Sequence, residues 1–427
     1  MRQDITGKRI CTAILIGAVL FAAAAGCLAR NIKTVTADTL QIAEESGSQE
    51  AESLFTERDM EQTPDLTEAV SYTVSDGQDI RITQEGVYVL SGEASGVTVY
   101  VEAGDEDKVQ LVLDGVNITN EGMPCIYVKS ADKVFVTTST DSVLTVTGAF
   151  GTDGDTSTDG AIFAKSDLVL NGTAVLTVHS DDNGIVSKDD LKITGGTYHV
   201  TASSKAFEAN DSIAVAGGSF EISAGTDAFH AENEDDDSLG YIYMEDGTFA
   251  IEAVDDGIHA NAFIQIDDGT YTISAGEGIE ATSIRINGGT IHIEASDDGI
   301  NAAQKSASYP IGIDIRGGDI TVDMGQGDTD GIDSNGYLTI TDGTISVNGQ
   351  SAFDIDGTIT FTGGTVTVNG QQTDSIPNQM MGGGFGGIQG QMPGGEGMPG
   401  GMQGQMPGGE GMPGGGIGMH GGGRHFS

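Results

Sequence analysis

The sequence predicts an all-β protein built as a parallel β-helix, a solenoid with about 21 to 22 residues in each coil. The first observation is a six-residue phrase that returns along the chain, as at residues 255–260 (Asp-Asp-Gly-Ile-His-Ala) and 297–302 (Asp-Asp-Gly-Ile-Asn-Ala). Its second position falls at residues 183, 205, 227, 256, 277, 298, 330 and 351, so the spacings are 22, 22, 29, 21, 21, 32 and 21. A fixed period with two longer steps indicates stacked repeats with two loop insertions.

The second observation is a Gly-rich corner followed by alternating apolar residues, which predicts the strands. It occurs in each period, for example at residues 193–200 and 286–293. Alternation with period two and β-branched residues favour short strands, and the middle of the chain shows no helical period. About three short strands in each coil fit a parallel β-helix. Hairpins would need turn pairs at closer spacing, and leucine-rich repeats would need a Leu/Asn pattern that is absent.

Composition agrees with this fold class and limits the partners. The chain has 66 Gly, 8 Pro and no Trp among 427 residues, which suits a β architecture rich in corners. It carries 18 Lys and Arg against 64 Asp and Glu, a net charge of −46. Such a charge excludes general binding of nucleic acid and disfavours direct electrostatic binding of anionic polymers. Cations and neutral ligands are the expected partners.

The N-terminal region is predicted to lie outside the β-helix, which we place at residues 69–375. A positively charged start, an apolar stretch at residues 10–25 and the sequence Ala-Ala-Gly-Cys ending at Cys27 predict a lipoprotein-type signal peptide over residues 1–27. Lipidation of Cys27 would anchor the protein to the membrane, on the extracellular face of the cytoplasmic membrane. The alternative is ordinary signal cleavage and secretion. Residues 28–68 are polar and predict a disordered linker.

The C-terminal residues 376–427 are rich in Gly, Met and Pro and predict a disordered tail. Residues 390–401 return at 404–415, and eight of the 13 methionines lie between Met380 and Met419. Such a segment cannot form a packed core. Thioether binding of Cu(I) is an alternative role, but a flexible tail is favoured. Cys125 is the only cysteine outside the signal, so we expect no disulfide and a small buried side chain.

The acidic residues of the repeated phrase predict metal binding. In a parallel β-helix, equivalent residues of successive coils lie about 4.8 Å apart. Two carboxylates at that distance repel by about 3–4 kcal/mol at an effective dielectric constant near 20. Ca²⁺, which takes six to eight oxygen ligands, would relieve this repulsion better than protonation. The candidate calcium ligands are the acids of the phrase and of the loop at residues 233–237, namely Asp227, Asp235, Asp236, Asp255, Asp256, Glu277, Glu280, Asp297, Asp298, Asp330, Asp333 and Asp354.

Two alternatives accompany this interpretation. Asp-Gly pairs can simply build corners, because Gly tolerates positive φ and Asp caps turns. His230 and His259 occupy the same place in two phrases, which permits a transition-metal site. We expect them instead to be surface histidines, since their neighbours are hard carboxylate ligands and no cysteine joins them. The phrase at residues 204–207 has Lys205 in place of an acid, so a metal there is doubtful.

Residues 73 to about 370 resemble the bacterial carbohydrate-binding domain family of secreted Clostridia proteins. The resemblance is carried by residues 109–118, 189–197 and 233–241, followed by the Asp-Gly-Ile phrases. It implies a right-handed β-helix akin to pectate lyases, calcium binding, and affinity for cellulose or acidic sugars without an established cleavage activity. No ligand assignment for individual residues follows from it.

Three classes of function remain open. The first, which we favour, is a surface-anchored, non-catalytic, calcium-dependent binder of polysaccharide, such as polygalacturonate or possibly cellulose. The second is a pectate-type lyase, which needs a basic residue near the metal; Arg285 and Arg316 are expected to be surface strand residues. The third is a structural or adhesive spacer. Tyr198, Tyr241, Tyr243 and Tyr271 are expected to pack in strands more than to stack on sugars. The sequence leaves the oligomeric state and the ligand-binding residues open.

Overall fold

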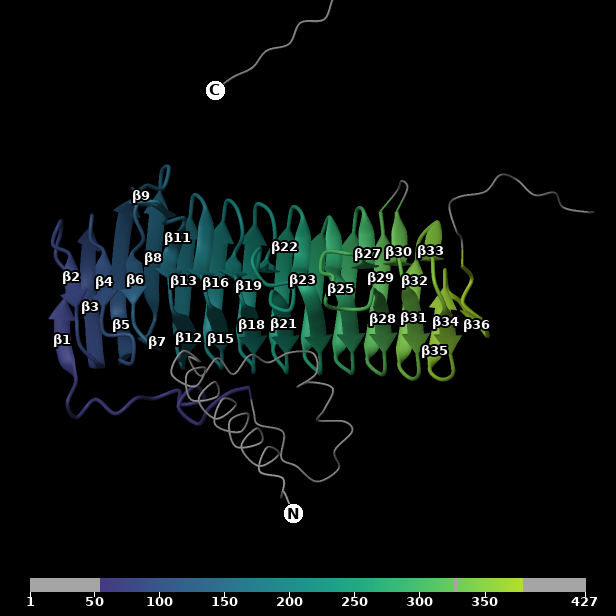
Figure 1. The fold of residues 1–427 in the computed structure, drawn as a ribbon, viewed down its shortest axis with the longest axis horizontal. Coiled ribbons are helices and arrows are strands. Elements are labelled where there is room, and N and C mark those ends of the chain that lie inside the picture. The colour runs from purple at the N-terminus through teal and green to yellow at the C-terminus, as the bar shows by residue number, and fades with distance from the viewer. Residues whose placement is uncertain (1–53, 326–328, 379–427) are drawn as a thin grey trace, which may run out of the picture. The chain divides into compact units, whose positions relative to one another are not determined.

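The computed structural model describes residues 54–325 and 329–378, and within them the chain is all β. The predicted signal peptide with Cys27, residues 28–53 of the predicted linker and residues 379–427 of the predicted tail lie outside the described residues. The described part contains no helix that is long and apolar enough to span a membrane. Thirty-four strands join in one sheet system, and their parallel partners follow one another across Figure 1.

The parallel strands form three stacks. In most periods the chain adds one strand to each of them. In each stack a strand pairs in parallel with the equivalent strand of the next repeat, as β14 (Asn183–Ser187) pairs with β17 (Phe207–Ala209). The first stack also contains β2 (Ile80–Ile82), β4 (Val99–Glu102), β6 (Ile126–Ser130), β11 (Gly160–Ala164), β20 (Phe229–Ala231), β27 (Asp298–Ala302), β30 (Asp330–Ser334) and β33 (Ser351–Ile355).

The second and third stacks follow the same rule. The second contains β1 (Val70–Thr73), β7 (Lys133–Thr140), β12 (Asp167–Gly172), β15 (Asp190–Ile193), β18 (Ser212–Val215), β21 (Tyr241–Met244), β28 (Gly312–Ile315), β31 (Tyr337–Ile340) and β34 (Ile359–Phe361). The third contains β8 (Ser142–Thr147), β13 (Val175–Ser180), β16 (Thr197–Ala202), β19 (Ser219–Ala224), β22 (Thr248–Ala253), β24 (Thr270–Ala275), β26 (Thr290–Ala295), β29 (Asp319–Met324), β32 (Thr344–Asn348) and β35 (Thr365–Val368).

Four long strands each contribute to two stacks. β3 (Gly86–Ser95) and β5 (Lys108–Glu121) join the second stack to the third, and β23 (Asp256–Ile266) and β25 (Glu277–Ile286) join the first to the second. The remaining strands are antiparallel: β9 (Thr152–Asp153) pairs with β10 (Thr156–Ser157), and β36 (Gln371–Thr373) pairs with β35.

The core lies between the stacks and is built from equivalent inward residues. Phe207, Phe229 and Ile258 are register partners in the first stack, and all three are fully buried. The rings of Phe207 and Phe229 stack with centroids 4.9 Å apart. Burial of such a continuous apolar column is the main favourable term in folding. Cys125 is buried as expected, and burial raises the pKa of its thiol to about 12.

The glycine of the repeated phrase is required by packing rather than by backbone conformation. Gly257 has no positive φ, and a Cβ atom there would lie 2.5 Å from Ile273 Cγ2 and 2.6 Å from the carbonyl oxygen of Gly278. The left-handed conformation belongs to the other phrase, as at Gly269 (φ 115°) and Gly289 (φ 91°). The φ argument for Asp-Gly corners therefore does not account for the glycine at this position.

The segment before the first strand packs on the second stack. Asp59 is fully buried, and its carboxylate lies 3.4 Å from Lys133 Nζ and 3.9 Å from Lys192 Nζ. The Gln62 side-chain amide donates to the carbonyl oxygen of Thr194 over 3.0 Å. Residues 54–62, which we assigned to a disordered linker, therefore belong to the folded unit.

Candidate metal and carbohydrate site

The acids of the repeated phrase lie on the outer face of the first stack, in two columns. The first column contains the residue before the glycine or alanine of each phrase, namely Asp227, Asp256, Glu277, Asp298 and Asp330; the register pairs Asp256 with Glu277 and Asp298 with Asp330. The second column lies three residues further along each strand and contains Glu208, His230, His259, Glu280, Asn301, Asp333 and Asp354. The side chains of residues i and i+3 contact each other across the two columns: Asp256 contacts His259, and Asp227 contacts His230.

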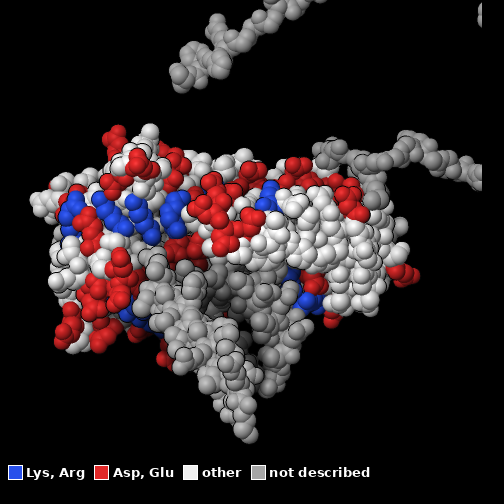
Figure 2. Space-filling model, viewed as in Figure 1, with Lys and Arg blue, Asp and Glu red and all other residues white. Residues whose placement is uncertain are grey.

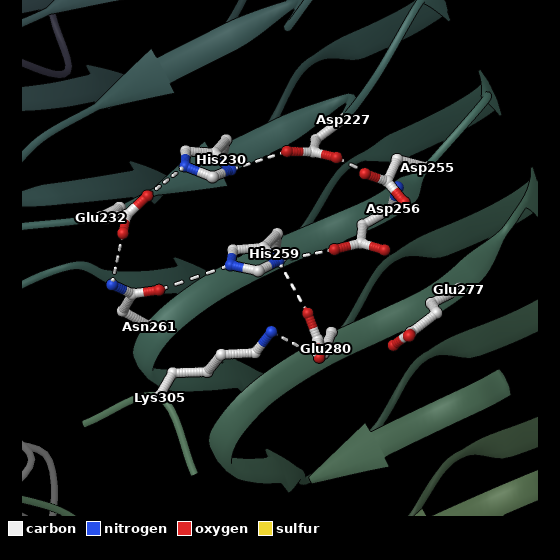
Figure 3. A pocket seen from close by; sticks show the side chains of 10 residues that line it. All are labelled: Asp227, His230, Glu232, Asp255, Asp256, His259, Asn261, Glu277, Glu280 and Lys305. Atoms are coloured by element: carbon white, nitrogen blue, oxygen red, sulfur yellow. Dashed lines mark hydrogen bonds and ion pairs between the residues drawn. The ribbon is translucent and has the colours of Figure 1, made fainter. Parts of the chain in front are cut away.

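The two columns line an open hollow with a volume of about 430 Å³ (Figure 3). It lies over β20, β23 and β25, and its walls are polar. Its lining residues are Asp227, His230, Glu232, Asp255, Asp256, His259, Asn261, Glu277, Glu280 and Lys305. Five of the predicted metal ligands therefore meet in one place.

Two stacked histidines form the floor of the hollow. The rings of His230 and His259 lie with centroids 4.7 Å apart and an interplanar angle of 13°. Both residues are buried, with exposed fractions of 7% and 9%, so our expectation of surface histidines is wrong. His230 Nδ1 lies 2.7 Å from Asp227 Oδ2, and His230 Nε2 lies 3.2 Å from Glu232 Oε2. The neighbouring carboxylates, which the sequence argument treated only as metal ligands, hold these rings in their buried positions.

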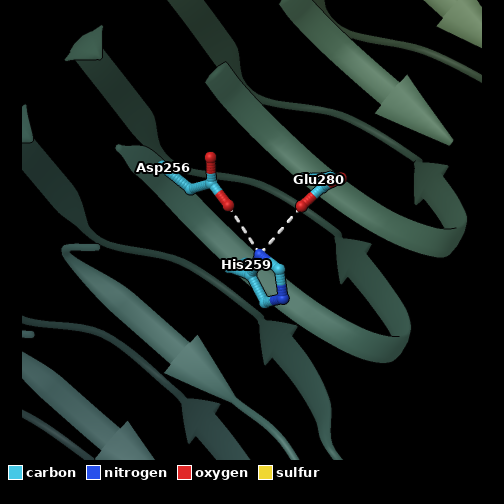
Figure 4. A group of neighbouring side chains, drawn as sticks. All are labelled: Asp256, His259 and Glu280. Atoms are coloured by element: carbon cyan, nitrogen blue, oxygen red, sulfur yellow. Dashed lines mark hydrogen bonds and ion pairs between the residues drawn. The ribbon is translucent and has the colours of Figure 1, made fainter. Parts of the chain in front are cut away.

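His259 is bound more tightly than His230, because two carboxylates share one of its nitrogens (Figure 4). Its Nδ1 lies 2.5 Å from Asp256 Oδ2 and 3.0 Å from Glu280 Oε2. Burial alone would lower the pKa of His259, but these two hydrogen bonds outweigh it and raise the pKa to about 10. Lys305 Nζ lies 2.8 Å from the other oxygen of Glu280 and holds that side chain in place.

Three further acids of the columns, Glu277, Asp298 and Asp333, have raised pKa values. Burial and then the charge of Glu280 raise the pKa of Glu277 to about 8. Burial raises the pKa of Asp298 to about 6, and burial with the charge of Asp298 raises that of Asp333 to about 7. Carboxyl groups of this kind gain stability from either a proton or a cation.

Two groups of side chains in the hollow have the geometry of metal ligands. In one, Asp227, Asp255 and Asp256 each offer an oxygen, and these atoms lie within 4.8 Å of one another. In the other, Asp256, His259 and Glu280 do the same. The first group consists only of hard oxygen donors, which suits Ca²⁺ better than a softer ion.

Four of the buried oxygens without a hydrogen-bond partner in the described structure belong to residues of the repeated phrase. They are Thr226 Oγ1, beside Asp227, and Asn301 Oδ1, Thr329 Oγ1 and Ser351 Oγ further along the stack. A buried oxygen that accepts no hydrogen bond costs free energy, and a bound cation would satisfy it. The carboxylates of Asp227, Asp255 and Asp256, with the unpartnered Thr226 Oγ1 next to Asp227 in the sequence, are donors of the type that calcium takes.

The other predicted ligands lie away from the hollow. Asp235 and Asp236 are exposed in the loop after β20, where Asp236 accepts hydrogen bonds from Ser238. Asp297 is exposed beside the first column. Asp298, Asp330, Asp333 and Asp354 continue the two columns beyond the hollow, over β27, β30 and β33.

Several residues near the site differ from expectation or were missed. Arg285 is not a surface residue: it is 7% exposed, and its guanidinium lies 5.6 Å from the centroid of the Phe263 ring. Tyr198 and Tyr271, by contrast, are buried in the core as expected, so their rings are not sugar platforms. Lys305 lies in the second loop insertion, where no repeated pattern marks it.

Comparison with known proteins places this chain in a family. Residues 76–331, more than half of the chain, match the family model described as carbohydrate-binding domain-containing protein, and the chain belongs to this family. A carbohydrate-binding domain-containing protein of Acetivibrio thermocellus is 38% identical over 130 residues, which are 29% of this chain and 46% of that relative. The alignment thus spans less than half of the relative's length.

A solved structure is also similar to this chain. It is a polysaccharide lyase-like protein from C. thermocellum, determined as a gadolinium derivative. The two proteins are 24% identical, with a TM-score of 0.40, and the match covers 70% of this chain and 96% of the other.

Proposed function

We propose that the protein binds polysaccharide without cleaving it, and that calcium held by the two acidic columns is required for binding. The observation that carries the proposal is the group of Asp227, Asp255 and Asp256, whose oxygens lie within 4.8 Å of one another. Thr226 Oγ1 is unpartnered beside them. Membership of a carbohydrate-binding domain family supports the carbohydrate part of the proposal. We also propose that the three strand stacks wind as a right-handed parallel β-helix.

Acidic polysaccharides such as polygalacturonate are the ligands that the acidic hollow with bound calcium favours. Direct contact between their carboxylates and a chain of net charge −46 would be repulsive. When bound, calcium would supply a positive charge and free coordination positions for sugar oxygens. Asp255 is exposed, whereas Asp227 and Asp256 are buried, so an ion held by all three would face the open side of the hollow.

The basic side chains near the hollow already bind other side chains of the protein, which favours binding of the polysaccharide without cleavage. A lyase needs a base near the metal to remove a proton from the sugar. Among the described residues, Lys305 is the only Lys or Arg that lines the hollow, and its ammonium group is bound to Glu280 over 2.8 Å. Arg285 packs on Phe263 outside the lining set.

The experiment that tests this function measures the thermal midpoint of the full chain in millimolar Ca²⁺ and in EDTA, with and without polygalacturonate. Ligands that bind only the native state raise the midpoint by mass action. We expect calcium to raise it, and polymer to raise it further only when calcium is present. If calcium does not change the thermal midpoint, the proposed cation site is refuted. If polygalacturonate does not raise the midpoint further, a structural spacer is favoured.

A pair of variants localises the calcium. Asp255→Asn removes the exposed carboxylate of the group. It should weaken calcium binding about tenfold, because about one charged ligand contact is lost. Glu252→Gln removes an exposed carboxylate three residues away and should leave calcium binding unchanged. Equal effects of the two variants would contradict the assignment. Products that absorb in the ultraviolet on incubation with polygalacturonate would show a lyase instead.

A further inference from the structure

Basic side chains form a row on the outer face of the first stack, on the N-terminal side of the hollow. Figure 2 shows a line of blue Lys and Arg groups on one face, next to a red patch of Asp and Glu. Val128 of β6, Ala164 of β11 and Ser187 of β14 are register partners. The residues that follow them are Lys129, Lys165 and Lys188, so these lysines lie on consecutive repeats. Arg81 on β2 lies two repeats before Lys129, and Glu102 of the intervening β4 contacts both of them. We call Arg81, Lys129, Lys165 and Lys188 the basic row.

The basic row lies on an aromatic floor that is separate from the main core. Tyr127, Phe163 and Val186 form a buried cluster of their own, with Tyr100 packed against it. The Tyr127 and Phe163 rings meet edge to face at 5.6 Å. These residues occupy the same outward position as Glu208 and the two histidines of the hollow, since the register continues from Phe163 to Val186 and on to Glu208.

The floor holds the cations at the surface. Arg81 lies 4.3 Å above the Tyr100 ring, and Lys129 lies 5.2 Å from the centroids of both Tyr100 and Tyr127. Such contacts fix a cation over a ring face and cover the aromatic carbon with its aliphatic stem. The charged ends stay accessible: the side chains of Arg81, Lys129 and Lys188 are 52%, 29% and 30% exposed.

The acidic groups near the row neutralise it only in part. Arg81 is 2.8 Å from Glu102, Lys129 is 2.9 Å from Asp153, and Lys188 is 2.8 Å from Glu208. Lys165 donates to the hydroxyl of Thr156 over 2.8 Å and is not among the ion pairs of the described residues. In a chain with 18 basic and 64 acidic residues, four cations in line on one face form a local exception.

We propose that the basic row binds carboxylate groups of an acidic polysaccharide that lies along the first stack and continues into the acidic hollow. This inference rests on the proposed polysaccharide binding and adds a second, calcium-independent contact surface to it. Strands of successive repeats lie about 4.8 Å apart, which is comparable with the length of one sugar ring in a linear polymer. Lys129, Lys165 and Lys188 follow register partners on consecutive repeats and so have this spacing, which matches a polymer with one carboxylate on each sugar, such as a polyuronate.

The test compares binding of the full chain to polygalacturonate and to its fully methyl-esterified form, each with calcium present. The row variant is Lys129→Gln with Lys165→Gln, and the matched control is Lys108→Gln with Arg316→Gln, two partly exposed basic residues outside the row. We expect the row variant to bind polygalacturonate about tenfold more weakly, as for two surface charge contacts, and the control to bind as the wild type does. The midpoint shift caused by calcium alone should be the same in all three proteins.

The outcomes separate the two proposals. If the wild type binds polygalacturonate and the row variant binds equally well, the basic row is refuted and the proposed function stands. If the wild type binds no polysaccharide, both are refuted. Preference of the wild type for phosphatidylglycerol vesicles over polygalacturonate would assign the row to a membrane surface and overturn the proposal. Should the row variant lose its thermal transition, Arg81→Gln with Lys165→Gln replaces it, because the Arg81 side chain is the most exposed of the row.

Discussion

Raising the pH from 5.5 to 8.5 in EDTA should destabilise the protein. The folded structure raises the pKa of Glu277 from 4.5 to about 8, of Asp298 from 3.8 to about 6 and of Asp333 from 3.8 to about 7. In this range the native state therefore binds more protons than the unfolded state, and the free energy of unfolding falls as pH rises. His259 has the same effect on stability. Because folding raises its pKa from 6.5 to about 10, the stabilisation that comes from its protonated form declines as the pH rises above 6.5.

The expected magnitude follows from the burial of the three carboxyl groups. Each is only about half buried, so solvent screening reduces the linked free energy to about 1 kcal/mol for each group and to roughly 2–4 kcal/mol in all. For a folded unit of this size that corresponds to a midpoint lower by roughly 3–6 °C. Calcium binds the ionised carboxylates, so the stabilisation by calcium should increase over the same pH range.

Scanning calorimetry at pH 5.5, 7 and 8.5, in EDTA and in calcium, measures this effect. Glu277→Gln, which cannot ionise, should reduce the pH dependence in EDTA, while Glu252→Gln on the exposed face of β22 should retain it. A midpoint in EDTA that is constant or rises over this pH range would refute the reasoning that crowded, half-buried acids define the site.

Two further substitutions test the core and the N-terminal segment. Phe229→Ala removes a fully buried ring that stacks on Phe207 at 4.9 Å, and should lower the free energy of unfolding in urea by about 3–5 kcal/mol. Asp59→Ala leaves the ammonium groups of Lys133 and Lys192 without their buried counter-ion and should cost about 3 kcal/mol. Trypsin should then cleave after Arg58 in the otherwise folded protein, and intact Arg58 under those conditions would contradict the docking of this segment.

The repeated part of the fold could be predicted because its residues obey one geometric rule. An inward residue of each repeat must fill the same space as its neighbours, so Ile258, Ile279 and Ile300 recur at the coil period of 21 residues and pair in register. The same period predicts that Asp256 lies opposite Glu277, as the register shows. All of this depends on spacing alone, which the sequence contains.

Contacts made by residues outside the repeated sequence pattern could not be predicted from that pattern. Lys305 reaches the hollow from a loop insertion, and Asp59 reaches the second stack from a polar segment without a periodic pattern. The steps from Lys129 to Lys165 and from Lys165 to Lys188 are 36 and 23 residues, because β9 and β10 interrupt the first of them. The histidines were misjudged for a different reason: their burial depends on the carboxylates around them, and those contacts exist only in the folded chain.

The outer column of the first stack shows how one scaffold can carry two kinds of surface. Inward positions are restricted to apolar residues, but the outward position of each repeat is free to change, and here it runs from Tyr127 through Phe163 and Val186 to Glu208 and His230. Aromatic residues at one end support cations, and acids at the other end would hold one under the proposed function. Glu208 lies at the junction and is bound by Lys188 over 2.8 Å, so the two surfaces meet without a gap. An anionic polymer along this column would find fixed positive charge over the first repeats and would depend on a bound ion only over the later ones.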